Sequence, residues 1–101
     1  MNVDARGQRL VERVGLEISA YERGDQTLAR LASQLKGAFA ALADSTPAET
    51  AHALADARMI LEVVNATAPA ETKAGSLATE DEAEVSRSLS EIRAILRTTD
   101  R

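Results

Sequence analysis

Residues 44–49 have the sequence DSTPAE, which is the clearest helix-start signal in this chain of 101 residues. Thr46 is a favoured N-cap residue, because its hydroxyl can accept a hydrogen bond from a free N–H of the first turn. Pro47 fits the first helical position, and Glu49 stands three residues after Thr46, as in a capping box. The stretch therefore predicts that one helix ends near residue 43 and that another runs over 47–65.

Two amphipathic helices are predicted before this boundary, because apolar residues recur there at helical spacing. The first stripe consists of Val11, Val14, Ile18 and Tyr21, and the second of Leu28, Leu31, Leu35 and Leu42. Gly24 is a typical residue to end the first helix, which predicts helices over 4–22 and 26–43. Asp25 and Thr27 are alternative N-caps for the second helix. The short connection predicts an antiparallel hairpin.

After the boundary, residues 59–64 are apolar on nearly every side of the third predicted helix. Such a segment lies either in the centre of a bundle or in a contact surface, and we expect the centre. Pro69 and Gly75 then indicate a loop over 67–78, which we expect to be mobile.

A fourth helix is predicted over 80–97. Thr79 and Glu82 have the spacing of a second capping box, and Val85, Leu89, Ile92 and Leu96 form one apolar face. The sequence therefore predicts an all-α, single-domain antiparallel four-helix bundle over residues 1–101.

The charge is distributed unevenly along the chain, although the net charge is only −4. Residues 1–43 carry six basic and five acidic side chains, whereas residues 44–101 carry six and eleven. An acidic half disfavours binding to nucleic-acid phosphates and suits a basic partner. The first residues lack the apolar region of a secretion signal, and no apolar run is long enough for a membrane span, so we expect a cytoplasmic protein without a secretion signal or a membrane partner.

Catalytic and metal-binding patterns are not recognisable in the sequence. The chain has one histidine, His52, and no cysteine, whereas a zinc site needs about four ligands that are mainly His or Cys. Arg6, Arg9 and Arg13 form a small basic stripe, but Glu12 and Glu17 interrupt it. We therefore predict a non-catalytic protein with no cofactor, no metal and no nucleic-acid partner; an enzyme or a nucleic-acid binder remains a third alternative.

Three segments, in this order, resemble a family of small helical immunity proteins from bacterial toxin–immunity systems, including contact-dependent inhibition and other polymorphic toxins. They are residues 18–24 (ISAYERG) ahead of the leucine stripe, residues 61–63 (LEV), and residues 79–82 (TEDE) leading into the last apolar face. The family pattern has Trp three residues before the Leu-Glu pair, where this chain has Arg58 and no Trp occurs anywhere.

The resemblance implies a small acidic protein that binds a cognate toxin domain, with a basic surface, and blocks it. Glu49, His52, Asp56 and Glu62 on the third helix are the predicted partner-binding residues. The alternative is a helical adaptor or regulatory protein that acts through homodimerisation, by way of residues 59–64, or through packing against a partner helix. We expect a monomer or a weak homodimer.

Overall fold

The computed structural model describes residues 5–99, which form four helices. They are α1 (Ala5–Glu22), α2 (Leu28–Leu42), α3 (Ala48–Thr67) and α4 (Thr79–Thr99). Each described end lies within two residues of its predicted position. Asp4, the predicted first helical residue, lies outside the described residues.

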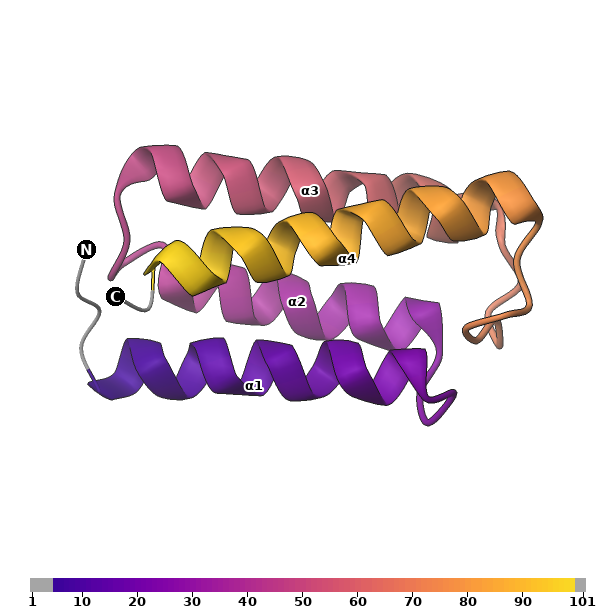
Figure 1. Cartoon of the computed structure of the whole chain (residues 1–101), viewed down its shortest axis with the longest axis horizontal. Coiled ribbons are helices and arrows are strands. Elements are labelled where there is room, and N and C mark those ends of the chain that lie inside the picture. The colour runs from indigo at the N-terminus through magenta and orange to yellow at the C-terminus, as the bar shows by residue number, and fades with distance from the viewer. Residues whose placement is uncertain (1–4, 100–101) are drawn as a thin grey trace.

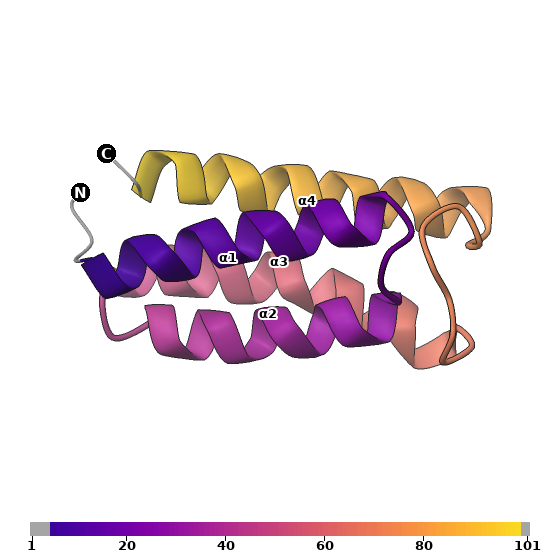
Figure 2. The same ribbon diagram turned by 90° about the horizontal axis from the view of Figure 1, so that it is seen from below.

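The helices form an elongated antiparallel bundle in which each helix packs against the next one in the chain (Figure 1). α4 closes the ring against α1, and these two contact each other least of the neighbouring pairs (Figure 2). The radius of gyration is 13.1 Å, close to the value of about 13 Å expected for a compact domain of this length. The all-α four-helix bundle is thereby confirmed. None of the helices in residues 5–99 is both long enough and apolar enough to cross a bilayer.

The core is aliphatic, and each helix contributes one buried stripe to it. The stripes follow the predicted spacing on α1, α2 and α4, with Phe39 and Tyr21 as the aromatic members. The residues of this core cluster are Val14, Ile18 and Tyr21 of α1; Leu28, Leu31, Leu35, Phe39 and Leu42 of α2; Leu54, Ala57, Leu61 and Val64 of α3; and Val85, Leu89, Ile92 and Leu96 of α4.

The connection between α1 and α2 is a tight turn with a cap on each side. Gly24 has φ = 81°, and its N–H donates to the Tyr21 carbonyl at 2.9 Å. The N–H of Asp25 donates to the Ala20 carbonyl at 2.8 Å, so the two bonds together form a Schellman motif. On the other side Thr27, not Asp25, is the N-cap of α2, and its Oγ1 accepts the N–H of Arg30 at 3.1 Å.

The predicted capping box at the start of α3 is wrong. Pro47 is the N-cap residue and makes no side-chain cap bond, and Glu49 is exposed in the first turn. Thr46 instead donates its hydroxyl hydrogen to the carbonyl of Leu42 at 3.0 Å. The threonine therefore satisfies a carbonyl in the last turn of α2, and α3 begins without a side-chain cap bond.

The second predicted capping box, at α4, is also wrong. Thr79 is already the first helical residue, so it is not the N-cap. The carboxylate of Glu82 accepts the N–H of Gly75 at 3.2 Å and that of Leu77 at 3.3 Å, so it binds the preceding loop. Glu82 therefore acts as a clamp on the loop and does not serve as half of a capping box.

The segment between α3 and α4, for which the sequence predicts a mobile loop, contacts the bundle from Thr72 onward. Thr72 is buried, and its carbonyl accepts the N–H of Leu28 at 2.8 Å. Ala74 and Leu77 pack against the core. With the Glu82 clamp, these contacts give residues 68–78 the form of a strap across one end of the bundle.

Residues 59–64 do not all lie in the centre of the bundle. Leu61 and Val64 are buried, but Met59 is 55 % exposed and Val63 is 63 % exposed. One helix face can enter the core of a ring of four helices, so the apolar residues on the other side of α3 remain in contact with solvent. The predicted central position therefore holds for Leu61 and Val64 but not for Met59 and Val63.

Candidate partner-binding surface

The outward side of α3 carries an exposed row of mixed apolar and polar residues. His52, Asp56, Met59 and Val63 follow the spacing i, i+4, i+7 and i+11, which places them on one helical face. All four are exposed, as is Glu49, which lies three residues before His52. We call these five residues the α3 surface.

The structure brings three of the four predicted partner-binding residues together. Glu49, His52 and Asp56 share the α3 surface, whereas Glu62 lies roughly 120° around the helix from Asp56. Glu62 accepts a hydrogen bond from Arg58 Nη1 at 2.7 Å, and only 16 % of the Arg58 side chain is exposed. The charge of Glu62 is therefore neutralised within the helix, and Glu62 is not part of the surface.

The neighbouring helix adds acidic side chains along the edge of the α3 surface. Arg93 of α4 bonds to Ser19 and Glu22 of α1, which identifies the flank of α4 that faces α1. The opposite flank, which must face α3, carries Glu84 and Glu91, both exposed.

Arg87, on the outer side of α4, lies between these two glutamates in sequence and offsets one of their charges. With Glu49 and Asp56 from α3, the region remains net negative. The α3 surface therefore combines an exposed apolar centre, Met59 and Val63, with an acidic edge.

The shape of this surface indicates what it can bind. The outward side of a helix is a convex ridge, which fits into a groove on another macromolecule and does not enclose a small molecule. Within residues 5–98 no three His, Cys, Asp or Glu side chains are arranged to hold a metal ion. The chemistry available to the α3 surface is therefore burial of apolar side chains and charge pairing.

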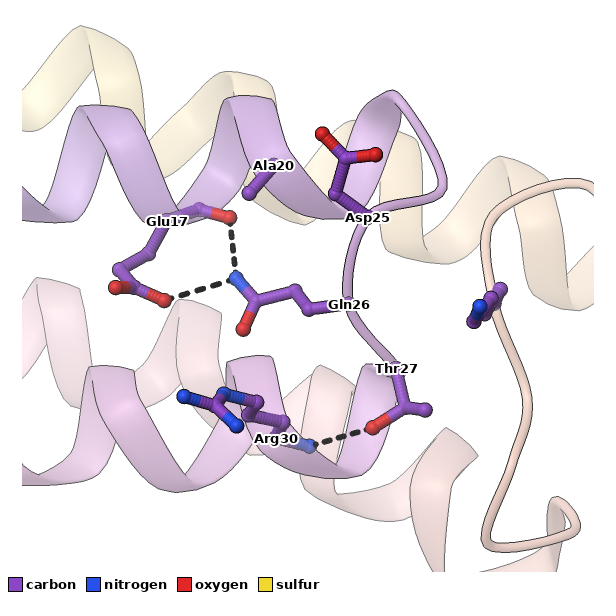
Figure 3. A pocket seen from close by; sticks show the side chains of 7 residues that line it. Glu17, Ala20, Asp25, Gln26, Thr27 and Arg30 are labelled. Carbon is purple, nitrogen blue, oxygen red and sulfur yellow. Dashed lines mark hydrogen bonds between the residues drawn. The ribbon is translucent and has the colours of Figure 1, made fainter.

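A larger hollow lies elsewhere, at the α1–α2 turn, and has a volume of about 790 Å³ (Figure 3). At its centre, Gln26 is buried and donates Nε2 to the carbonyl oxygen of Glu17 at 2.7 Å and to Glu17 Oε2 at 2.9 Å. Thr27, on the rim, is occupied as the N-cap of α2.

Charges of both signs line this hollow, with Glu17 and Asp25 against Arg30 and Lys73. Asp25 is paired with Arg23 at 3.0 Å, and the hydrogen bonds of Gln26 join the turn to α1. These bonds explain why a polar side chain is buried here, so we assign the hollow a structural role in bracing the turn.

Met59 and Val63 are the surface residues that the sequence interpretation placed wrongly. A signal for them exists in the sequence, because a helix that is apolar all round must bury more than one face or expose some of it. Signals for Glu62 also exist in the sequence, because helical spacing places it roughly 120° from Asp56 and four residues after Arg58, its salt-bridge partner.

Comparisons of the chain with protein-family models, with curated proteins and with solved structures found no significant match.

Proposed function

We propose that this chain is a non-catalytic protein-binding module that inserts the α3 surface into a groove on a basic partner protein. The observation that carries the proposal is the exposure of Met59 and Val63, at 55 % and 63 %, on the face that also holds Asp56 and Glu49. Exposed large apolar side chains grouped beside charges are typical of protein interaction sites.

The energetics fit an anchored interface. Complete burial of a Met or Val side chain contributes roughly 1.5–3 kcal/mol. Because about half of the surface of Met59 and of Val63 is exposed, about half of this burial energy is available to a complex. Two such anchors supply part of the affinity of a complex, while the acidic edge steers a basic partner and disfavours others. A helix of 20 residues is about 30 Å long, which is sufficient for an interface of ordinary size.

A cognate bacterial toxin domain is the partner that we propose, so the chain would act as an immunity protein in the cytoplasm. The support is the acidic character of residues 44–101 and the resemblance described above. Toxin domains that act on nucleic acids need basic surfaces to bind phosphates, and an acidic ridge that covers such a surface would block the substrate.

The test is co-expression of the chain with the toxin domain encoded by its neighbouring gene. We expect the wild-type chain to restore growth and to bind the purified domain. Met59→Asp with Val63→Asp should weaken binding by at least tenfold, because it places charges where apolar contacts are needed. Leu16→Asp is the matched control, since Leu16 is 70 % exposed on α1 and lies outside the α3 surface. Equal loss of binding in the control, or none in the double variant, would refute the assignment of the surface.

Homodimerisation through the same apolar residues is the second candidate function. Met59 and Val63 could contact their counterparts in a second copy across a two-fold axis. The same axis would bring the like charges of Asp56 and Glu49 of both copies together, which disfavours this arrangement. Light scattering over a range of protein concentrations distinguishes the two: a mass that doubles in the wild type but not in Met59→Asp supports the dimer.

A further inference from the structure

A small apolar groove lies along the seam between α1 and α4, on another side of the molecule from the α3 surface. Its volume is about 290 Å³. Val11, Ile18 and Leu96 supply its apolar lining, and two arginines, Arg93 and Arg97, supply its polar groups. The seam belongs to the pair of neighbouring helices with the fewest contacts, which leaves the groove open to solvent.

Gly15 lines this groove, and the rest of the described chain gives no reason for a glycine there. It lies inside α1, where glycine weakens a helix relative to alanine. A Cβ atom built at Gly15 would meet no atom within 4 Å, and its φ is not positive. Neither close helix packing nor backbone conformation therefore accounts for it, and its effect is to leave space in the groove.

The two arginines of the groove differ in their partners. Arg93 donates to Ser19 Oγ at 3.1 Å and is paired with Glu22 at 2.8 Å, so its charge is already balanced. Arg97 is exposed, and in the described part of the chain its guanidinium makes no hydrogen bond or ion pair. Arg97 is therefore a cation that lines the apolar groove without an ion-pair partner among residues 5–98.

We propose that this groove binds an aliphatic carboxylate. The hydrocarbon chain would lie over Gly15 against Val11 and the exposed edge of Leu96, and the carboxylate would accept hydrogen bonds from Arg97. Arginine suits this role because its planar guanidinium matches a carboxylate with two parallel N–H groups.

The size of the groove selects this class of ligand. Its volume is close to the lower end of the range of small-molecule sites, about 300–1,000 Å³. A partner helix is about 10–12 Å across with its side chains and is too wide for such a hollow. A neutral or cationic chain would leave Arg97 without a counter-charge.

The test is a titration of the ¹⁵N-labelled full chain with decanoate below its micelle concentration, followed by NMR. We expect amide shifts confined to residues 11–18 and 92–97. Decyltrimethylammonium, which has a chain of the same length and the opposite charge, should bind about tenfold more weakly or not at all. Arg97→Gln should weaken decanoate binding by about tenfold for the same reason. Shifts spread over the whole surface, or equal binding of the cation, would overturn the proposal.

A matched pair of variants separates filling of the groove from unfolding. Gly15→Leu should abolish decanoate binding while it maintains or raises the melting temperature, because it places a side chain in open space within a helix. Gly37→Leu is the control: Gly37 also lies inside a helix and has open space where a Cβ would stand, but it belongs to α2. Decanoate binding should persist in Gly37→Leu and in the Met59→Asp, Val63→Asp variant. Binding that survives Gly15→Leu would overturn the proposal.

Discussion

The hydroxyl group of Tyr21 lies in the core without a hydrogen-bond partner among the described residues. Tyr21 is 2 % exposed. Burial and, as the smaller cause, the negative charge of Glu82 together raise the pKa of its phenol from 10.0 to about 12. A buried polar group without a partner costs free energy, so this residue is a weak point of the core, as is Ser88, whose buried hydroxyl also has no partner among the described residues.

Replacement of Tyr21 by Phe removes the unpaired hydroxyl and keeps the ring. We expect the free energy of unfolding at pH 7 to stay the same or to rise by about 1 kcal/mol, since no hydrogen bond is lost. Urea unfolding followed by circular dichroism measures it. A decrease of more than about 1 kcal/mol would mean that the hydroxyl has a partner after all.

The raised pKa of Tyr21 also predicts a dependence of stability on alkaline pH. Below pH 10 the phenol is protonated in both the folded and the unfolded chain and contributes no pH dependence. Between pH 10 and about 12 the unfolded chain releases this proton and the folded chain retains it, so stability falls as pH rises. The loss should be on the order of 2 kcal/mol at pH 12.

Tyr21→Phe is the control for this decline, because every other titrating group is the same in both proteins. The difference between the two unfolding free energies should grow from pH 10 upward. Parallel curves for wild type and variant would contradict the prediction.

Gly24 and Gly15 should respond in opposite ways to alanine. Gly24 has φ = 81°, a backbone conformation that alanine adopts only with strain, so Gly24→Ala should destabilise the chain by about 1 kcal/mol. Gly15 is helical with open space around it, so Gly15→Ala should stabilise the chain by about 0.5–1 kcal/mol. Thermal unfolding of both variants at one pH tests the pair.

At the scale of the elements, apolar spacing and turn residues were sufficient to predict all four described helices. The capping residues of these helices were less predictable, because a side chain that lies between two helices, such as that of Thr46, can form a hydrogen bond with either of them. It donates to the last turn of α2, although its spacing to Glu49 fits a cap for α3. Thr27, one of the two predicted N-cap residues, has no such competing use and caps α2.

The Glu82 clamp should control how firmly the strap, residues 68–78, is held. Glu82→Gln removes the charge that strengthens the bonds from the Gly75 and Leu77 N–H groups, so these two amides should exchange with solvent several-fold faster. Glu80→Gln is the control, because Glu80 is exposed in the same first turn and shares the interaction with the helix dipole. Equal rates in both variants would show that the carboxylate does not hold the strap.

At the scale of the whole molecule, Arg93 joins the last helix of the chain, α4, to the first, α1. Its pair with Glu22 bridges α1 and α4, but both side chains are more than one-third exposed, at 36 % and 43 %. Water screens such a pair, so a double-mutant cycle of Arg93→Gln and Glu22→Gln should give a coupling energy of roughly 0.2–1 kcal/mol. The coupling should shrink in high salt. A coupling energy above about 2 kcal/mol would contradict the expectation that water screens this ion pair.

The candidate binding surface was only partly predictable from the sequence. Helical spacing correctly grouped Glu49, His52 and Asp56, because one period relates all three. The exposure of Met59 and Val63 depends on how α3 is rotated in the ring, and this rotation is decided jointly by the other three helices. The groove beside Gly15 depends on the packing of α1 against α4, which lie at opposite ends of the sequence.

The order of helices around the bundle also bears on how the chain folds. α1 packs on α2, α2 on α3 and α3 on α4, so most native contacts join segments that are close in sequence. Such low contact order is associated with folding in microseconds to milliseconds. The α1–α4 seam requires the longest loop closure, so it should form late and open early, and a ligand that occupies it would slow the unfolding reaction more than it speeds folding.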